Sequence, residues 1–155
     1  MEQKQLPRIV VGVDGSAQSV EALRYAQRIA PLFDATIHAV SAWEYPAEYA
    51  GYVPLGSDNF SHTTRDRLDT TLAAAFGDHL PEGLESSVEF AHPAKALAKA
   101  SEGAAMLIVG RRGHGTFHGL LLGSVSAACV SHARCPVLVV HPSEEPAEEL
   151  REEQR

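Results

Sequence analysis

The chain has 155 residues, of which 45% are hydrophobic and 21% charged, as is typical of one globular domain. Its net charge is −7, and the last twelve residues, with six Glu and two Arg, carry −4 of that charge. A surface that binds nucleic acid would be basic, so this balance argues against nucleic-acid binding. Because no apolar run approaches the roughly 18 residues of a membrane span and the start lacks a signal-peptide core, we expect a cytoplasmic protein that contacts neither nucleic acid nor membrane.

The first part of the chain alternates apolar runs with helical periodicity. Residues 6–13 are rich in β-branched side chains and predict a buried strand, which ends at the turn Asp14-Gly15-Ser16. Ser16 can cap the helix that follows. Residues 35–42 predict a second strand, and we interpret His38 inside it as a structural residue with a satisfied side chain.

Residues 43–57 combine Trp43 and three tyrosines with two prolines and two glycines, which favours an irregular loop. The aromatic rings fit a local cluster that shields the core, and they equally fit a flap over a flat heterocycle. The two interpretations are compatible, and both stay open at this point.

The rest of the chain continues the alternation. We predict a helix over 58–80, a strand at the sheet edge over 86–91, a helix over 94–102, a strand over 105–110, a helix over 124–132 and a strand over 136–141. Cys129 and Cys135 are too few for a disulfide framework, and we expect small buried apolar residues. Residues 144–155 predict a disordered or frayed tail to a single domain over 1–143.

Strands that alternate with helices predict an α/β fold, with an open five-stranded parallel sheet and helices on both faces. Ligands bind such sheets beyond the carboxyl ends of the strands. A glycine-rich segment follows the fourth predicted strand, with Gly110, Gly113, Gly115, Gly119 and Gly123 within fourteen positions and a helix from Ser124. Glycine amides and the N–H groups of a helix start together favour an anion site, the alternative being a plain surface loop.

Known phosphate-binding fingerprints do not match this segment. The Walker form requires GxxxxGK[ST], and no lysine follows Lys99. The dinucleotide form requires GxGxxG after the first strand, whereas the nearest match, over 113–119, is one residue too long and follows a late strand.

Three separated motifs instead resemble one family. They are IVVGVDGS over 9–16, Gly110-x2-Gly113-x9-Gly123-Ser124, and CPVLVV over 135–140. In this order they resemble the ATP-binding branch of the universal stress protein family, and the likeness covers about residues 7–142. The resemblance implies strand order 3-2-1-4-5, an adenine nucleotide alpha hydrolase-like fold, in which the strand ends that carry Asp14 and Gly110 are neighbours.

By this resemblance the protein is an ATP-binding stress-response regulator. Loop amides and the last helix start would hold the triphosphate, and the backbone of Val40 would contact adenine. Asp14 would accept from ribose hydroxyls or share Mg²⁺ or Mn²⁺ with the phosphates, its alternative being a turn-forming Asp without a ligand. The predicted binding residues are Gly12, Asp14, Val40, Gly110, Arg111, Gly113, His114, Gly115, Thr116, Gly119, Gly123, Ser124, Val125 and Ser126, with Asp14 as the metal ligand.

The resemblance also implies a homodimer through the last strand, Val137–Val140, since its apolar edge would otherwise be exposed or covered by the acidic tail. The sequence has no second acidic residue beside an apolar strand, as in a Walker B element, so we expect weak ATPase activity at most. The rival hypothesis is a slow ATP-hydrolysing or nucleotidyl-transferring enzyme of the same class. Nucleotidylyl transferases of this class carry HxGH after the first strand and pyrophosphate-cleaving enzymes carry SGGxDS there, whereas this sequence has VGVDGSAQS. A receiver domain would need an Asp and a Lys where Ala91-His92 and His141-Pro142 stand.

Overall fold

The computed structural model describes residues 5–49, 51, 59–111 and 122–141. Its elements in chain order are β1 (Arg8–Gly12), α1 (Ala17–Ile29), the 3-10 turn η1 (Ala30–Phe33), β2 (Thr36–Trp43), the 3-10 turn η2 (Ala47–Tyr49), α2 (Asn59–Phe76), β3 (Glu85–Phe90), α3 (Pro93–Ala100), β4 (Met106–Gly110), α4 (Ser124–His132) and β5 (Val137–Val140). Strands and helices alternate as predicted, and α4 has the predicted bounds.

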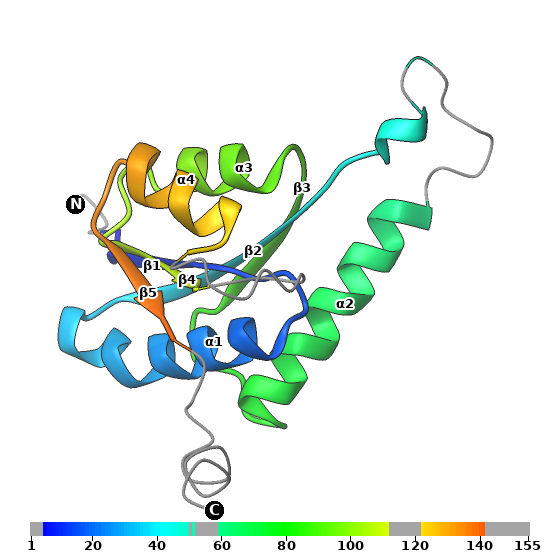
Figure 1. Cartoon of the computed structure of the whole chain (residues 1–155). Helices are drawn as coiled ribbons and strands as arrows, with labels where there is room; N and C mark the ends of the chain where they lie inside the picture. The colour runs from blue at the N-terminus through cyan, green and yellow to red at the C-terminus, as the bar shows by residue number, and fades with distance from the viewer. Residues whose placement is uncertain (1–4, 50, 52–58, 112–121, 142–155) are drawn as a thin grey trace, which may run out of the picture.

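The five strands are parallel and lie in the order β3-β2-β1-β4-β5, which confirms the expected topology (Figure 1). At the centre, Gly12 of β1 is level with Val40 of β2, and Val11 is level with Ile108 of β4. β3 lies at one edge, as predicted for the less apolar strand, and β5 lies at the other.

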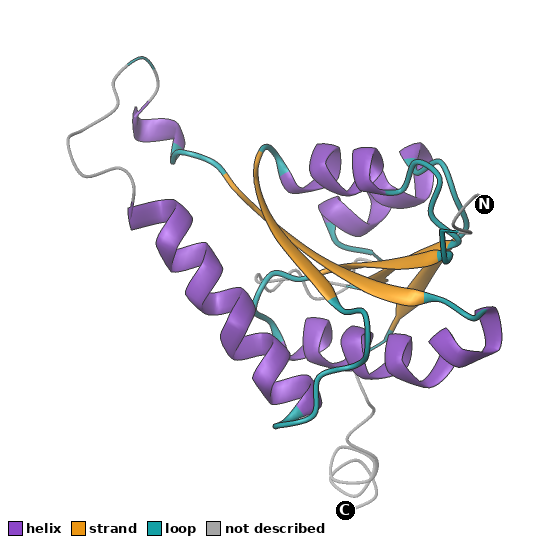
Figure 2. Cartoon of the chain, turned by 180° about the vertical axis from the view of Figure 1, so that it is seen from behind, coloured by secondary structure: helices purple, strands orange, loops and turns teal. Residues whose placement is uncertain are grey.

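Helices cover both faces of the sheet. Figures 1 and 2 show α1 and α2 on one face and α3 and α4 on the other. Ile9 and Val11 of β1 belong to the core cluster that contains Leu68 of α2, whereas Val10 belongs to the cluster that contains Leu97 of α3. Because both faces of the central strands are buried, their sequences are continuously apolar. No helix in the described ranges combines the length and apolarity needed to cross a bilayer.

Two predicted bounds differ for a clear structural reason. β2 extends to Trp43 because that residue pairs with Phe90 of β3. The helix predicted to run to Leu80 ends at Phe76, because Gly77 has a φ of +63° and donates its N–H to the Ala73 carbonyl at 2.8 Å. The predicted tail over 144–155 lies outside the described residues.

The aromatic residues at the end of β2 form a local cluster. The ring centroid of Phe90 lies 4.6 Å from that of Trp43 and 5.3 Å from that of Tyr45. Phe60 of α2 completes the cluster, with its ring 6.0 Å from Tyr45 and 6.1 Å from Tyr49. The cluster therefore joins β2 to β3 and to the start of α2. The local-cluster interpretation is confirmed for these residues.

The two cysteines differ in burial. Cys129 of α4 is fully buried, and burial raises the pKa of its thiol to about 11. A thiol of this kind stays protonated at neutral pH and is a poor nucleophile, so the expected role as a small apolar residue is confirmed. Cys135 is only partly buried, although burial raises its pKa as well.

His38 lies half-buried in β2, with its Nε2 2.9 Å from the Ser87 hydroxyl of β3. Burial lowers the pKa of its imidazole, and the Arg8 guanidinium acts in the same direction, against the carboxylates of Glu85 and Glu89. The side chain has a hydrogen-bond partner inside the sheet, so the predicted structural role is confirmed.

This lowered pKa predicts acid sensitivity. The unfolded chain takes up a proton at His38 at a higher pH than the folded protein does. Neutral His38 therefore contributes fully to the free energy of unfolding above about pH 6.5. This contribution is lost as the pH falls toward the lowered pKa of the folded state. His38→Gln keeps a polar group near the Nε2 position and should flatten that part of the profile. Urea unfolding at a series of pH values measures it, and an unchanged slope in the variant would contradict the assignment.

Candidate functional site

The candidate site lies where the strand order reverses. β1 and β4 are neighbours, but the helices that follow them, α1 and α4, lie on opposite faces of the sheet (Figure 1). Their carboxyl ends border a cleft of about 590 Å³, lined by the ends of β1, β2 and β4, the starts of α3 and α4, and one side of α2. This volume lies in the range of sites for small molecules.

The turn after β1 holds Asp14 at the cleft. Its Oδ1 accepts a hydrogen bond from the Ser16 N–H at 2.9 Å, and Gly15 between them has a φ of +84°. The Ser16 hydroxyl in turn accepts from the Ser19 N–H at 3.2 Å and caps α1. Asp14 therefore forms the turn, as its non-ligand interpretation predicts, and its exposed carboxylate also lines the cleft.

Gly12 has a packing role at the floor of the cleft. A Cβ atom on this residue would lie 2.8 Å from Leu97 Cδ1 and 3.3 Å from Val109 Cγ1. The absence of a side chain thus lets α3 approach the central strands closely.

The ends of β1 and β2 are tied together beside the cleft. The Val13 N–H donates to the Val40 carbonyl at 2.9 Å, and the buried Ser41 hydroxyl donates to the Val13 carbonyl at 2.6 Å. The carbonyl of Val40 is thus engaged in the sheet. Because backbone groups alternate in direction along a strand, those of Ala42 face the same side as those of Val40, beyond the end of β1.

The start of α4 faces the cleft without a side-chain cap. Its N-cap residue is Gly123, whose own N–H donates to the Arg111 carbonyl at 2.8 Å. Ser124 and Val125 of the first turn line the cleft. The buried Ser126 hydroxyl donates to the Gly110 carbonyl, so of the two predicted serine hydroxyls the exposed one is that of Ser124.

The cleft gathers most of the predicted binding residues that the structure describes. Gly12, Asp14, Val40, Gly110, Gly123, Ser124, Val125 and Ser126 all line it. Arg111 follows directly after β4 and donates its N–H to the Val140 carbonyl at 2.9 Å. The predicted residues Gly113, His114, Gly115, Thr116 and Gly119 lie outside the described residues.

Several cleft residues were not predicted from the sequence. Thr64 and Arg67 of α2 line it, as do Ser19, Ser41, Pro93 and Leu97. Thr64 and Arg67 are three residues apart, a spacing that places both on one side of a helix. That spacing was visible in the sequence, but nothing local indicated that α2 would lie against the cleft. The rings of Trp43, Tyr45 and Tyr49 are not among the lining residues.

The described ranges contain no group of three His, Cys, Asp or Glu side chains that could hold a metal ion. Asp14 is a carboxylate that lines the cleft. A divalent cation here would therefore need most of its oxygen ligands from a bound molecule and from water, as Mg²⁺ often does beside phosphates.

The model of the Universal stress protein family matches residues 6–141. The chain belongs to this family. A universal stress protein of Mycolicibacterium smegmatis is 32% identical over 150 residues, which cover 92% of this chain and 51% of that protein. The chain thus spans about half the length of the curated relatives it matches.

Solved universal stress proteins share the fold. UspA from Lactobacillus plantarum has a TM-score of 0.70 at 18% identity, over 89% of this chain and 99% of that one. A universal stress protein solved in complex with cAMP has a TM-score of 0.57 at 28% identity, over 89% of this chain and 98% of that one. The family that the three motifs indicated is confirmed, together with its strand order.

The tie between β1 and β2 can be tested by Ser41→Ala. The variant removes the donor to the buried Val13 carbonyl and should lower the free energy of unfolding by about 1–2 kcal/mol. Urea unfolding measures the change. Ser131→Ala removes an exposed hydroxyl of α4 and should cost less than about 0.5 kcal/mol. Equal effects of the two variants would contradict the role of Ser41.

Proposed function

We propose that this protein binds an adenine nucleotide, ATP in particular, in the cleft between β1 and β4, and acts as a stress-response regulator. The observation that carries the proposal is the start of α4, where Gly123 offers no side chain to the first-turn amides that face a cleft of about 590 Å³. Asp14 lies in the same cleft. The similar universal stress protein solved with cAMP supports an adenine nucleotide as the class of ligand.

The phosphate groups would lie at the start of α4. The N–H groups and partial positive charge of a helix start favour an anion. Ser124 adds an exposed hydroxyl at the same place. The backbone amides over 113–119 and the side chain of Arg111 belong to this proposal as further phosphate ligands. They lie in the chain between Gly110 and Gly123, which both line the cleft.

The base and the sugar would lie toward β1 and β2. The backbone of Val40 would contact adenine at the end of β1. The backbone N–H and carbonyl of Ala42 face the same side of β2 and would offer a donor and an acceptor to the edge of adenine. Leu97 and Val109 supply apolar surface for the ring. Asp14 would accept from ribose hydroxyls or share Mg²⁺ or Mn²⁺ with the phosphates.

Gly123→Asp separates nucleotide binding from folding. Gly123 has φ −68° and ψ 166°, an extended conformation that suits an Asp N-cap. The new carboxylate would accept from the first-turn amides and place negative charge where the phosphates belong. ATP affinity, measured by isothermal titration calorimetry, should fall about tenfold or more, while the free energy of unfolding stays within about 0.5 kcal/mol or rises.

Gly123→Asn is the matched control, because it makes the same cap without the charge and should lose less affinity. Wild-type protein that binds no adenine nucleotide would refute the proposal. So would a normally folded Gly123→Asp variant with unaltered ATP binding.

We further propose that the protein forms a homodimer through β5, so that nucleotide occupancy can alter the shape of the dimer. The carbonyls of Pro136 and Val140 accept from Leu107 and Arg111, so these residues face β4. By the two-residue period, the backbone groups of Val137 and Val139 face outward from the sheet edge. Edge strands with apolar side chains favour pairing with a second copy.

Val139→Pro tests this interface. The substitution removes one outward N–H and leaves the β4-facing hydrogen bonds of β5 in place. By analytical ultracentrifugation, the dissociation constant of the variant dimer should be about tenfold or more higher than that of the wild type. The far-UV circular dichroism of the variant should remain that of the folded protein. A monomeric wild type, or a variant dimer of unchanged affinity, would refute the interface.

A further inference from the structure

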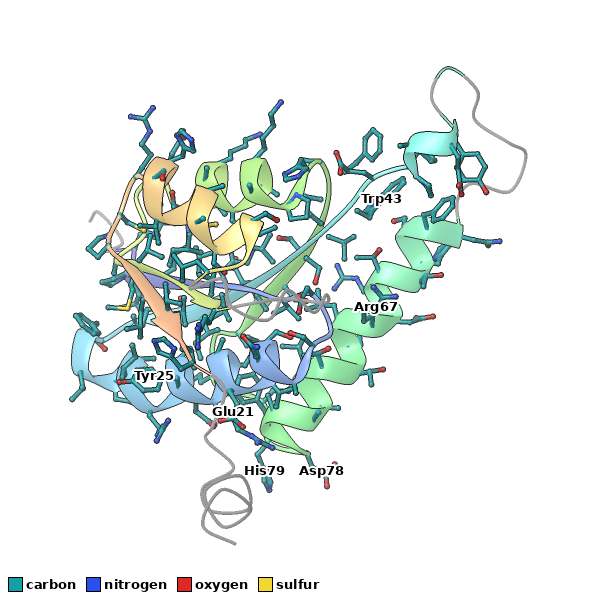
Figure 3. All side chains as sticks on the ribbon, in the orientation of Figure 1. Glu21, Tyr25, Trp43, Arg67, Asp78 and His79 are labelled. Atoms are coloured by element: carbon teal, nitrogen blue, oxygen red, sulfur yellow. The ribbon has the colours of Figure 1, made fainter. Side chains whose placement is uncertain are left out.

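Helix α2 contributes a wall of the cleft. It runs obliquely past the end of β1 (Figures 1 and 3). Leu68 and Leu72 are buried in the core and determine how the helix is rotated about its axis. Arg67 precedes Leu68 directly, so it lies at the border between this buried face and solvent, where it lines the cleft together with Thr64.

The stem of Arg67 packs on the turn that carries Asp14. A Cβ atom on Gly15 would lie 2.4 Å from Arg67 Cδ and 2.6 Å from Cγ, so the stem occupies the space that a side chain on Gly15 would need. Gly15 also has a φ of +84°, which glycine adopts without strain. This contact positions the guanidinium beside the cleft rather than leaving the whole side chain in open solvent.

Within the described ranges, the guanidinium of Arg67 has no hydrogen-bond or ion-pair partner. Other arginines of the same part of the structure are engaged: Arg65 donates to the Ser86 hydroxyl at 3.0 Å, and Arg24 donates to Glu21 and to the Ala74 carbonyl, both at 3.1 Å. Arg67 thus presents a planar cation with its donors available at the mouth of a cleft that also contains the start of α4.

We propose that Arg67 binds the phosphate of the nucleotide from the α2 side of the cleft. This assignment rests on the proposed function. A guanidinium presents paired N–H donors that match two oxygens of a phosphate, and the α4 amides would hold the same group from the opposite element. Arg67 thereby makes affinity depend on the charge of the ligand, so that nucleotides are favoured over nucleosides.

The test compares ATP, AMP and adenosine on three proteins by isothermal titration calorimetry, with competition against ATP for the weak ligands. Arg67→Gln should weaken ATP and AMP about tenfold or more and leave adenosine within about twofold. Arg67→Lys keeps the charge without the fork and should recover part of the loss. The matched control is Arg65→Gln, two residues earlier on α2, which removes a guanidinium engaged by Ser86 and should leave all three affinities unchanged.

The outcomes separate a failure of the Arg67 assignment from a failure of the proposed function. An equal loss for adenosine and ATP would overturn the assignment, because Arg67 would then act on the base or on the fold. Unchanged ATP and AMP affinity in a folded Arg67→Gln variant would overturn it as well, while the proposed function would stand. Wild-type protein that binds none of the three ligands would refute the proposed function and this assignment together.

Discussion

The connections that follow β1 and β4 leave toward opposite faces of the sheet, and the rest of the structure depends on this constraint. These two strands are hydrogen-bonded neighbours, yet α1 and α4 lie on opposite faces of the sheet. Connections that leave in opposite directions cannot cover the strand ends between them, so a cleft follows from the topology. At the floor of this cleft, Gly12 leaves room for the side chains of Leu97 and Val109.

Short hydrogen-bonded links shape this cleft. Ser41 donates to the Val13 carbonyl, and Ser126 donates to the Gly110 carbonyl, so each central strand end is satisfied by a buried serine from another element. Backbone carbonyls at strand ends need such partners once they are removed from water. At α4 the corresponding N–H groups face the cleft after a glycine N-cap. The two strand-end carbonyls are therefore satisfied internally, whereas the start of α4 faces the cleft.

Helix α2 connects the core to the surface of the site. Its buried leucines hold it against α1 and the sheet, and this packing brings Arg67 over Gly15. Phe60 in its first turn contacts Tyr45, which packs with Trp43 and Phe90 in the aromatic cluster. One helix thus ties the outer end of β2 to the turn after β1. A ligand in the cleft would contact an element whose position depends on both the core and this cluster.

The sequence by itself determined the class of fold, because the periods of strands and helices are local properties. Continuous apolar runs marked the central strands, the weaker run over 86–91 marked an edge, and the residues from Ser124 after the glycine-rich segment marked the start of α4. The motifs also placed Asp14 and Gly110 beside each other, since the strand ends that carry them are neighbours in this topology. Only the tertiary structure assigned Ser41 to the Val13 carbonyl, joined the Val13 N–H to the Val40 carbonyl, and brought Arg67 to the cleft. These features depend on contacts between segments far apart in the chain, and such contacts leave no periodic signal in either segment.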